Sequence, residues 1–465
     1  MIGAMPLRKI DPFDRFVLSV LLILAAAIGL VIALGDRVGV QIVQVSPVDV
    51  QDFGARSSIT LTFAEPMIAE SVESRFTIEP VVAGDWVWSE RRVTFRPTAP
   101  LMPGELLTLR LAAGAESRTG RRLLADQAWT FQVRAPQIVY LAAGQANPRE
   151  LWRIDPATLE RIQLTHTDGR IFDFAVAPDG ESIVFSLINA EFGTDFWLVG
   201  RDGVDTQLLL DCGPDLCSGA AWSADGQRIA YSREPAGLAP GAPKGPPRVW
   251  TLSVSDSQTA PLYQDGQIIG YSPAWSPDGS MLGMVDNSTS SIRVLQLKDQ
   301  TELLLETHQG TMGSFSPDGS RLIYTTLRFD DATAPQPFTM VMVADLDRTG
   351  SLLPILGREY NVADYGTPAW SPTGEWIAIN QRTENSGPSK QVWIVRPDGS
   401  EATALTADAD YTYAGYRWSP WGDALVMQRF PLGKPYATPE VVLWTMAAGA
   451  EQVLAVDASL PEWLP

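Results

Sequence analysis

The chain has 465 residues, of which 45% are hydrophobic, with 35 prolines and 38 glycines. This length is too great for one ordinary domain, and the composition is typical of a globular, turn-rich protein with two or three domains. The net charge is −19, and because the first 35 residues carry three basic and two acidic side chains, the remainder carries −20. Such a surface repels nucleic acid and anionic lipid, so no nucleic-acid partner is expected.

The first predicted element is a membrane helix. Residues 16–34, FVLSVLLILAAAIGLVIAL, are 19 uncharged residues that would span roughly 28 Å as a helix, close to the thickness of a bilayer core. Three basic residues precede this run and only Arg37 closely follows it. The positive-inside rule therefore predicts residues 1–15 in the cytoplasm, a transmembrane helix over 16–35 and the rest of this single-pass protein outside the cell membrane. A cleaved signal peptide is the alternative, although the run exceeds the ~7–15 apolar residues of a signal peptide.

Residues 40–135 are predicted to form a small β-sandwich. The segment has no cysteine, and turn signals such as MPGE at 102–105 separate several of its seven short strand-like runs. The runs are QIVQVS, SITLTF, RFTIEP, DWVWS, RVTFRP, LLTLRLA and AWTFQVR. The stretches ITLTFAEPM (59–67), VTFRPTAPLMPGELLTLRL (93–111) and WTFQV (129–133) resemble the bacterial Ig-like domains of surface-layer and other envelope proteins. This resemblance implies a spacer.

From residue 137 onward a short phrase recurs, as in PAWSPDG at 273–279. Proline presets φ for the first turn corner, Asp tolerates the second and Gly supplies the positive-φ corner, so each copy predicts a strand that ends in a tight turn. The six copies are separated by 46, 53, 40, 55 and 48 residues, a period typical of solenoids and propellers. Their equivalent positions are Pro178, Ala224, Pro277, Pro317, Pro372 and Pro420.

Each repeat contains four strands, which we call a, b, c and d in chain order. The c and d strands occur seven times, one more than the turn phrase. The segment QIVYLAA at 137–143 is a b strand with no a strand before it, and LPEWLP at 460–465 is an a strand with no b strand after it. Together they complete one repeat. We therefore predict an all-β chain whose residues 137–465 form a seven-bladed β-propeller, closed by the C-terminal a strand beside the first b strand.

The repeats, with turns such as SPDG and strands such as RIAYS and VWIVR, resemble those of TolB-type (WD40-like) propellers. The resemblance implies a fold and no function, because TolB has six blades and a different N-terminal domain. Prolyl oligopeptidase relatives share such repeats, but no G-x-S-x-G motif of their hydrolase domain occurs here. The aromatic position of the phrase is expected to fill the contacts between blades. The residues at this position are Trp222, Trp275, Trp370, Trp418 and Trp463, with Phe315 and Val176 as equivalents.

Loop lengths distinguish the two faces of the predicted propeller. The a–b and c–d turns are short, whereas b–c connections such as 233–248 and 429–440 and d–a connections such as 357–368 and 407–416 are long. In antiparallel blades the b–c and d–a connections share one face, which we call the long-loop face. Long loops carry function more often than tight turns, so the binding surface is predicted there.

Arginines and tyrosines gather in these long loops. They are predicted to contact a protein or a glycan, with the arginines attracting anionic groups. Ion pairs with nearby carboxylates and ordinary loop packing are the alternatives. The predicted binding residues are Arg233, Arg328, Arg382, Arg429, Tyr360, Tyr365, Tyr411, Tyr413 and Tyr416.

Catalytic and metal-binding residue types are scarce. The two cysteines, Cys212 and Cys217, predict a local disulfide in an oxidising compartment. His166 and His308 are the only histidines and lie in no recognisable triad or ligand spacing. We therefore predict no catalytic residue, metal or cofactor.

These features favour a membrane-anchored protein whose extracytoplasmic propeller binds a protein or an envelope glycan. A propeller hydrolase or lyase with its site at the channel mouth is an alternative, because carboxylates paired between blades leave no pattern in the sequence. A structural envelope protein is a third interpretation. Clustered carboxylates in the channel would favour the enzyme, and a shallow aromatic patch on the long loops would favour binding.

Overall fold

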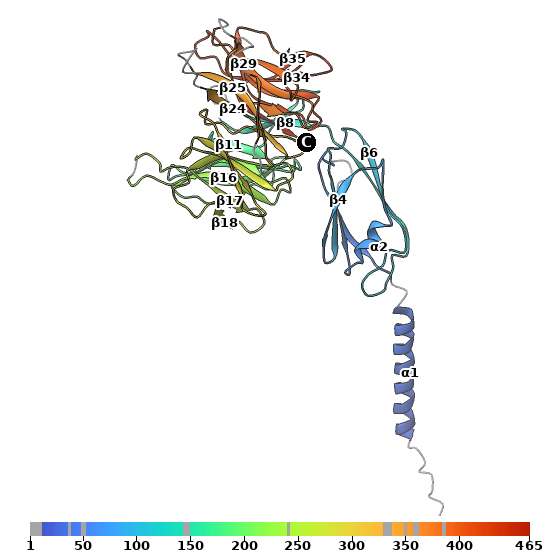
Figure 1. Ribbon diagram of the computed structural model, residues 1–465. Coiled ribbons are helices and arrows are strands. Elements are labelled where there is room, and N and C mark those ends of the chain that lie inside the picture. The colour runs from blue at the N-terminus through green and yellow to red at the C-terminus, as the bar shows by residue number, and fades with distance from the viewer. Residues whose placement is uncertain are drawn as a thin grey trace, which may run out of the picture. The chain divides into compact units, whose positions relative to one another are not determined.

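The computed structural model describes residues 12–35, 39–47, 53–142, 149–239, 242–328, 337–347, 351–356, 362–383 and 387–465. The chain forms two compact units (Figure 1). The first unit comprises Met1–Phe53 and Ser57–Val133, and the second comprises Gly54–Arg56 and Arg134–Pro465.

The first element is a helix, α1 (Pro12–Gly35), which contains the apolar run at 16–34. Among the residues that the structure describes, no helix offers an apolar stretch long enough to cross a membrane. The structure thus contains the expected helix without supporting its membrane-spanning role, which stays a prediction from the sequence.

The first unit contains two antiparallel sheets, in agreement with the seven strand-like runs of the sequence. One sheet has the order β1 (Ile42–Ser46), β2 (Ile59–Phe63), β5 (Arg92–Pro97), β4 (Gly84–Ser89). The other has the order β3 (Phe76–Glu79), β6 (Leu106–Leu111), β7 (Gln127–Gln132). Alternate residues of β2 and β6, such as Leu61 and Leu109, are buried, which is the period-2 pattern of strands with one face on a core. A short helix, α2 (Ala69–Glu73), was not expected from the sequence.

The described strands of the second unit form seven sets, each paired antiparallel, which we call blades 1 to 7 in chain order. Blades 2 and 3 are connected in one eight-stranded sheet, so these sets make six sheets. Blade 1 is β36 (Ala458–Leu464), β8 (Gln137–Ala142), β9 (Leu151–Ile154) and β10 (Arg161–Gln163). Blade 2 is β11 (Ile171–Val176), β12 (Ser182–Ile188), β13 (Thr194–Gly200) and β14 (Gln207–Leu210). Blade 3 is β15 (Leu216–Trp222), β16 (Arg228–Glu234), β17 (Arg248–Ser253) and β18 (Thr259–Pro261). A single parallel pairing, Thr194 with Leu216, joins blades 2 and 3.

The remaining four blades follow the same order of pairing. Blade 4 is β19 (Gly270–Trp275), β20 (Met281–Asp286), β21 (Ser291–Gln296) and β22 (Glu302–Glu306). Blade 5 is β23 (Ser314–Phe315), β24 (Arg321–Arg328), β25 (Phe338–Asp345) and β26 (Leu352–Leu356). Blade 6 is β27 (Val362–Tyr365) and β28 (Ala369–Trp370), which share the a position, with β29 (Ile377–Thr383), β30 (Gln391–Val395) and β31 (Thr403–Ala404). Blade 7 is β32 (Tyr411–Trp418), β33 (Ala424–Pro431), β34 (Glu440–Thr445) and β35 (Ala450–Val456).

The C-terminal strand pairs with the first strand of the unit, as the repeat count predicts. In β36 Trp463 lies opposite Ile138 of β8, and Glu462 lies opposite Val139. Leu464, at the end of β36, is fully buried in a hydrophobic cluster of blades 1 and 2. Blade 1 is therefore completed by both ends of the unit, which leaves β8 without an exposed edge.

Tryptophans at the a strands join neighbouring blades. The indole of Trp222 donates to the Ala175 carbonyl of the preceding blade at 3.1 Å. Trp275, Trp418 and Trp463 make the equivalent bond to the a strand before them. Trp370 is the exception, because its indole donates to Gly374 within its own turn. Trp370 nevertheless packs against blade 5 and Phe315 against blade 4. The prediction that the aromatic position of the turn phrase fills contacts between blades is therefore confirmed for these residues as well as for the four tryptophans.

The turn phrase has the backbone that its residues predict. All six of its glycines have φ between 67° and 76°, a conformation that costs glycine nothing and other residues about 1 kcal/mol. The serine before the proline also fixes the turn, as in Ser316, whose Oγ donates to Asp318 at 2.6 Å. Hydrogen bonds from Ser316 and Ser320 hold the pKa of Asp318 below its ordinary value. The repeated phrase is therefore architecture.

Candidate functional site

Two of the predicted binding arginines are paired with nearby carboxylates. Arg233 Nε lies 2.7 Å from Asp215 Oδ2. Arg429 lies 2.8 Å from Glu440 and 2.9 Å from Glu451, and only 13% of its side chain is exposed. Both arginines therefore form ion pairs within the protein, which is the alternative to ligand binding that the sequence left open.

The other two arginines are more accessible. Arg328 is exposed at the end of β24, and Arg382 is half-buried in β29. Of the predicted tyrosines, Tyr411 is half-buried beneath Arg429, whose guanidinium carbon lies 4.0 Å from the centre of the ring. Tyr360 lies outside the described residues.

Three predicted binding tyrosines are buried. Tyr365, Tyr413 and Tyr416 expose 5% of their surface or less. The Tyr413 hydroxyl donates to Glu451 at 2.9 Å, and that of Tyr416 donates to the Thr367 carbonyl. Burial raises the pKa of both phenols. These side chains pack between strands, so the prediction that they lie on a contact surface is wrong. The sequence shows that tyrosines are frequent in these loops, but it does not show which rings point into the protein.

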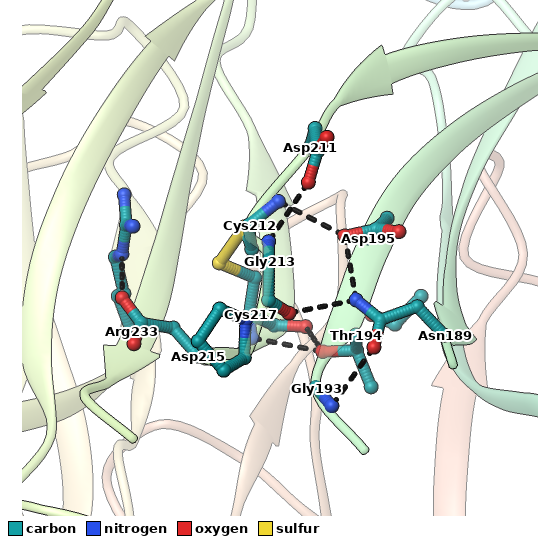
Figure 2. Close-up of a disulfide and its surroundings, with 12 residues drawn as sticks. Asn189, Gly193, Thr194, Asp195, Asp211, Cys212, Gly213, Asp215, Cys217 and Arg233 are labelled. Atoms are coloured by element: carbon teal, nitrogen blue, oxygen red, sulfur yellow. Dashed lines mark hydrogen bonds and ion pairs between the residues drawn. A yellow bond between two sulfur atoms is a disulfide. The ribbon is translucent and has the colours of Figure 1, made fainter. Parts of the chain in front are cut away.

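A disulfide braces the long-loop face between blades 2 and 3 (Figure 2). Cys212 and Cys217 are bonded, and both are buried. The Thr194 hydroxyl donates to the Cys217 carbonyl at 2.6 Å, and the Cys217 N–H donates to Thr194 Oγ1 at 2.8 Å. Asn189, in the b–c turn of blade 2, reaches the same loop through a 2.7 Å bond from Nδ2 to the Gly213 carbonyl. The disulfide loop (residues 211–217) and this b–c turn are therefore held as one piece.

We expect the variant with both Cys212→Ala and Cys217→Ala to lose about 2 kcal/mol of unfolding free energy, because a bridge that closes a short loop restricts the unfolded chain by about that amount. Chemical unfolding with and without dithiothreitol measures the loss. Reductant should shift the midpoint of the wild type and leave that of the variant unchanged. Equal midpoints for the wild type and the variant in the absence of reductant would contradict this expectation.

Two aromatic residues at loop tips of the long-loop face are exposed in a strained backbone conformation. Phe192, in the b–c turn of blade 2, is 84% exposed with φ of 61°. Tyr436, in the b–c loop of blade 7, is 90% exposed with φ of 66°. Leu238, in the b–c loop of blade 3, is also fully exposed. Sequence reasoning missed these residues, because neither exposure nor a positive φ at a bulky side chain leaves a pattern in the sequence.

The turn that carries Phe192 is fixed by its neighbours. Asn189 Oδ1 accepts hydrogen bonds from the N–H groups of Glu191 and Gly193, each at 3.0 Å. Gly193 packs so closely that a Cβ there would lie 2.1 Å from the Gly213 carbonyl oxygen. Lys244 Nζ donates to the Phe192 carbonyl at 3.2 Å. Phe192 is thus presented to solvent on a rigid support.

Charges around this sector are unbalanced. Two basic residues near the Phe192 turn already have partners, because Arg233 pairs with Asp215 and Lys244 donates to backbone carbonyls. Glu191 and Asp211 are exposed, and within the described residues neither forms an ion pair. The Phe192 tip therefore stands beside exposed carboxylates, whereas Lys434 is exposed beside Tyr436.

Two carboxyl groups on a strands, those of Asp173 in β11 and Glu462 in β36, have a raised pKa. Burial raises the pKa of Asp173 despite hydrogen bonds from Ser186 Oγ and, at 2.7 Å, from the Gly219 N–H. Burial likewise raises the pKa of Glu462, which lies 3.7 Å from Arg417 Nε. Among the described residues no three His, Cys, Asp or Glu side chains are placed to hold a metal ion.

The two histidines make local contacts. His166 Nδ1 lies 3.0 Å from Gln163 Nε2, and His308 Nε2 lies 3.2 Å from Glu306 Oε1. Both contacts are with residues two or three positions away in the sequence, as a structural role would produce.

Residues 36–133 match the bacterial Ig-like domain family. The chain is similar in fold to a putative TolB from Agrobacterium tumefaciens, with 23% identity and a TM-score of 0.41 over 54% of this chain and 84% of that one. TolB from Acinetobacter baumannii is 15% identical, with a TM-score of 0.42 over 84% of this chain and 83% of its own. Oligogalacturonate lyase from Vibrio parahaemolyticus is 13% identical, with a TM-score of 0.41 over 62% of this chain and 72% of its own. No curated protein matches the chain.

The chain therefore carries a bacterial Ig-like domain and a unit similar to TolB-like propellers. At these identities the likeness to solved structures concerns the fold alone. It gives no evidence that this chain shares the ligands or activities of those proteins.

Proposed function

We propose that this protein is a membrane-anchored, extracytoplasmic binding protein whose long-loop face docks a partner protein. The observation that carries the proposal is the pair of exposed aromatic residues, Phe192 and Tyr436, held at positive φ. A bulky residue in this conformation costs about 1 kcal/mol, and neither side chain recovers the cost by packing. Backbone strain that no packing interaction of the folded protein offsets is typical of residues that bind a ligand.

The chemistry of the tips supports a protein rather than a glycan as partner. Phe192, Leu238 and Tyr436 offer apolar anchors, and aromatic anchors in apolar pockets dominate protein–protein binding energies. The exposed carboxylates of Glu191 and Asp211 near Phe192, on a chain with net charge −19, favour a partner with a basic rim. We therefore propose an apolar pocket bordered by Lys or Arg as the complementary surface.

The test is affinity capture from envelope extract, followed by measurement of the dissociation constant for the recovered partner. We expect the variants Phe192→Gly and Tyr436→Gly to weaken binding roughly 30-fold each, the effect of losing an anchor worth about 2 kcal/mol. Their stability should stay within about 1 kcal/mol of the wild type, since glycine relieves the positive-φ strain while adding entropy to the unfolded chain.

Leu159→Gly is the matched control. Leu159 is also exposed (44%) with φ of 60°, but it lies in a c–d turn on the opposite face. We expect this variant to bind as the wild type does. Equal binding by all three glycine variants would contradict the proposed surface, and recovery of a partner that survives protease treatment of the extract would favour the glycan alternative instead.

The anchor is proposed from the sequence of residues 16–34, which has the length and apolar character of a bilayer-spanning segment. Attachment is tested by washing membranes with alkaline carbonate. A chain that leaves the membrane in this wash would show that the run does not anchor it.

A propeller hydrolase or lyase is the second candidate, favoured by Asp173 and Glu462. A carboxyl group with a raised pKa is suited to act as a general acid. Both groups are also held by structural partners, Ser186 with Gly219 and Arg417 respectively. Release of reducing ends from envelope glycans, abolished by Asp173→Asn, would favour the enzyme over the binding protein.

A further inference from the structure

A hollow of about 350 Å³ opens on the long-loop face, between blades 2, 3 and 4. It is lined by Asp173, Ser218, Gly219, Ser232, Glu234, Pro247, Tyr271, Ser272 and Asn287. Its volume falls within the roughly 300–1,000 Å³ typical of small-molecule sites. The Phe192 and Tyr436 tips do not line it.

One part of this lining is fixed by hydrogen bonds. The Gly219 N–H donates to Asp173 Oδ2 at 2.7 Å, and the Ser272 N–H donates to Ser232 Oγ at 3.2 Å. The Tyr271 hydroxyl donates to the Gly310 carbonyl at 2.9 Å. Gly219 and Ser272 stand at equivalent bulges of their a strands and both have positive φ, 63° and 49°. Positive φ strains the backbone at Ser272, whereas Gly219 adopts it without strain.

The other part of the lining has polar groups with no partner. Among the described residues, the side chains of Ser218, Glu234, Ser272 and Asn287 form no hydrogen bond or ion pair with the protein. They offer two hydroxyls, a carboxylate and an amide, which can both donate and accept hydrogen bonds. The hydrogen-bonded part of the lining thus lies beside several polar side chains that have no partner in the protein. This arrangement is typical of a preformed polar binding site.

The charges of the lining select the ligand. It contains the carboxylate of Glu234 and the carboxyl group of Asp173, and no basic side chain. Anionic ligands are therefore disfavoured, whereas hydroxyl groups can donate to carboxylates in charge-assisted hydrogen bonds. We propose that this hollow is a binding site for an uncharged saccharide, held through its hydroxyl groups by Glu234, Ser218, Ser272 and Asn287. The site differs from the proposed protein-docking surface in its residues and its chemistry, and it stands without that proposal.

The proposal is tested by calorimetric titration of the full chain with cellobiose, maltose and N,N′-diacetylchitobiose. Galacturonic acid serves as the anionic probe and spermidine as the cationic one. We expect at least one neutral disaccharide to bind, galacturonic acid to bind more weakly, and Glu234→Gln to weaken the neutral sugar about tenfold, because a hydrogen bond to a charged acceptor becomes one to a neutral amide. Asn287→Ala, an exposed substitution, should weaken it as well.

Glu191→Gln is the control, since Glu191 is an exposed carboxylate on the same face that does not line the hollow. It should bind the neutral sugar as the wild type does, and matching unfolding midpoints for all variants would show that folding is unchanged. Three results would overturn the proposal: no binding of any neutral disaccharide, binding of spermidine alone, or equal affinity of the wild type and the Glu234→Gln and Asn287→Ala variants.

Discussion

Leu464→Ala is expected to lower the unfolding free energy of the propeller unit by about 2–5 kcal/mol. Leu464 is fully buried and packs with residues of both blade 1 and blade 2, including Leu141 and Ile171. Truncation removes apolar contacts and leaves a cavity at the place where the ring closes. Guanidinium unfolding followed by tryptophan fluorescence measures the loss.

Leu460→Ala provides the comparison on the same strand. Leu460 is 41% exposed and has φ of 52°. Alanine carries the same backbone strain at this φ as leucine, so the substitution changes only the exposed side chain. We expect a change within about 0.5 kcal/mol. A Leu464→Ala variant as stable as Leu460→Ala would mean that β36 does not close the ring in solution.

Asp286→Ala is expected to cost about 3 kcal/mol or more. Asp286 is fully buried, and its Oδ2 lies 2.8 Å from a guanidinium nitrogen of Arg293, whose side chain is only 10% exposed. Removing one partner of a buried pair leaves the other charge without full compensation. Part of the loss should be recovered in the double variant Asp286→Ala, Arg293→Met, in which the buried cation is absent as well.

The effect of Asp286 should depend on pH. Burial alone would raise the pKa of Asp286, but hydrogen bonds from Ser288 and Arg293 outweigh it and hold that pKa below the ordinary value. A lowered pKa in the folded state contributes stability above the unfolded-state pKa of about 4, and this contribution is lost as pH falls further. The difference between wild type and variant should therefore be full at pH 7 and shrink below about pH 4.

The exposed pair Arg321 and Asp345 is the control for this prediction. Their charged atoms are 4.0 Å apart, and 45% and 50% of the two side chains are exposed. Asp345→Ala should cost less than about 1 kcal/mol, because water screens such pairs. Similar losses of unfolding free energy for Asp286→Ala and Asp345→Ala would show that burial does not make the Asp286 pair more important than the exposed one.

Much of the fold could be predicted because it rests on local chemistry that repeats. Gly279 and its equivalents require positive φ in every copy of the turn, and the period of the phrase marks the blades. The incomplete repeats at residues 137–143 and 460–465 predicted the pairing of β36 with β8. The helix α2 and the division of the blade 6 a strand into β27 and β28 were missed, because both depend on packing rather than on a local pattern.

The candidate site was much less predictable. The sequence showed arginines at strand ends, but the partners of Arg429 come from a c strand and a d strand and are recognisable only once the blade has formed. It showed clustered tyrosines, yet Tyr413 and Tyr416 face inward while Tyr436 faces water. The Ser218, Glu234, Ser272 and Asn287 cluster brings together residues of two blades, 3 and 4, so no spacing in the sequence could reveal it.

Closure by β36 also sets the timing of assembly. Pairing joins residues 138 and 463, so the ring can be completed only after nearly the whole unit has been synthesised. Until then β8 presents an open edge that invites pairing with other chains. A ribosome stalled after β35 and before β36 would thus yield a product in which blades 2 to 7 are complete and blade 1 lacks its a strand. Such a chain would need a chaperone to keep it from aggregating.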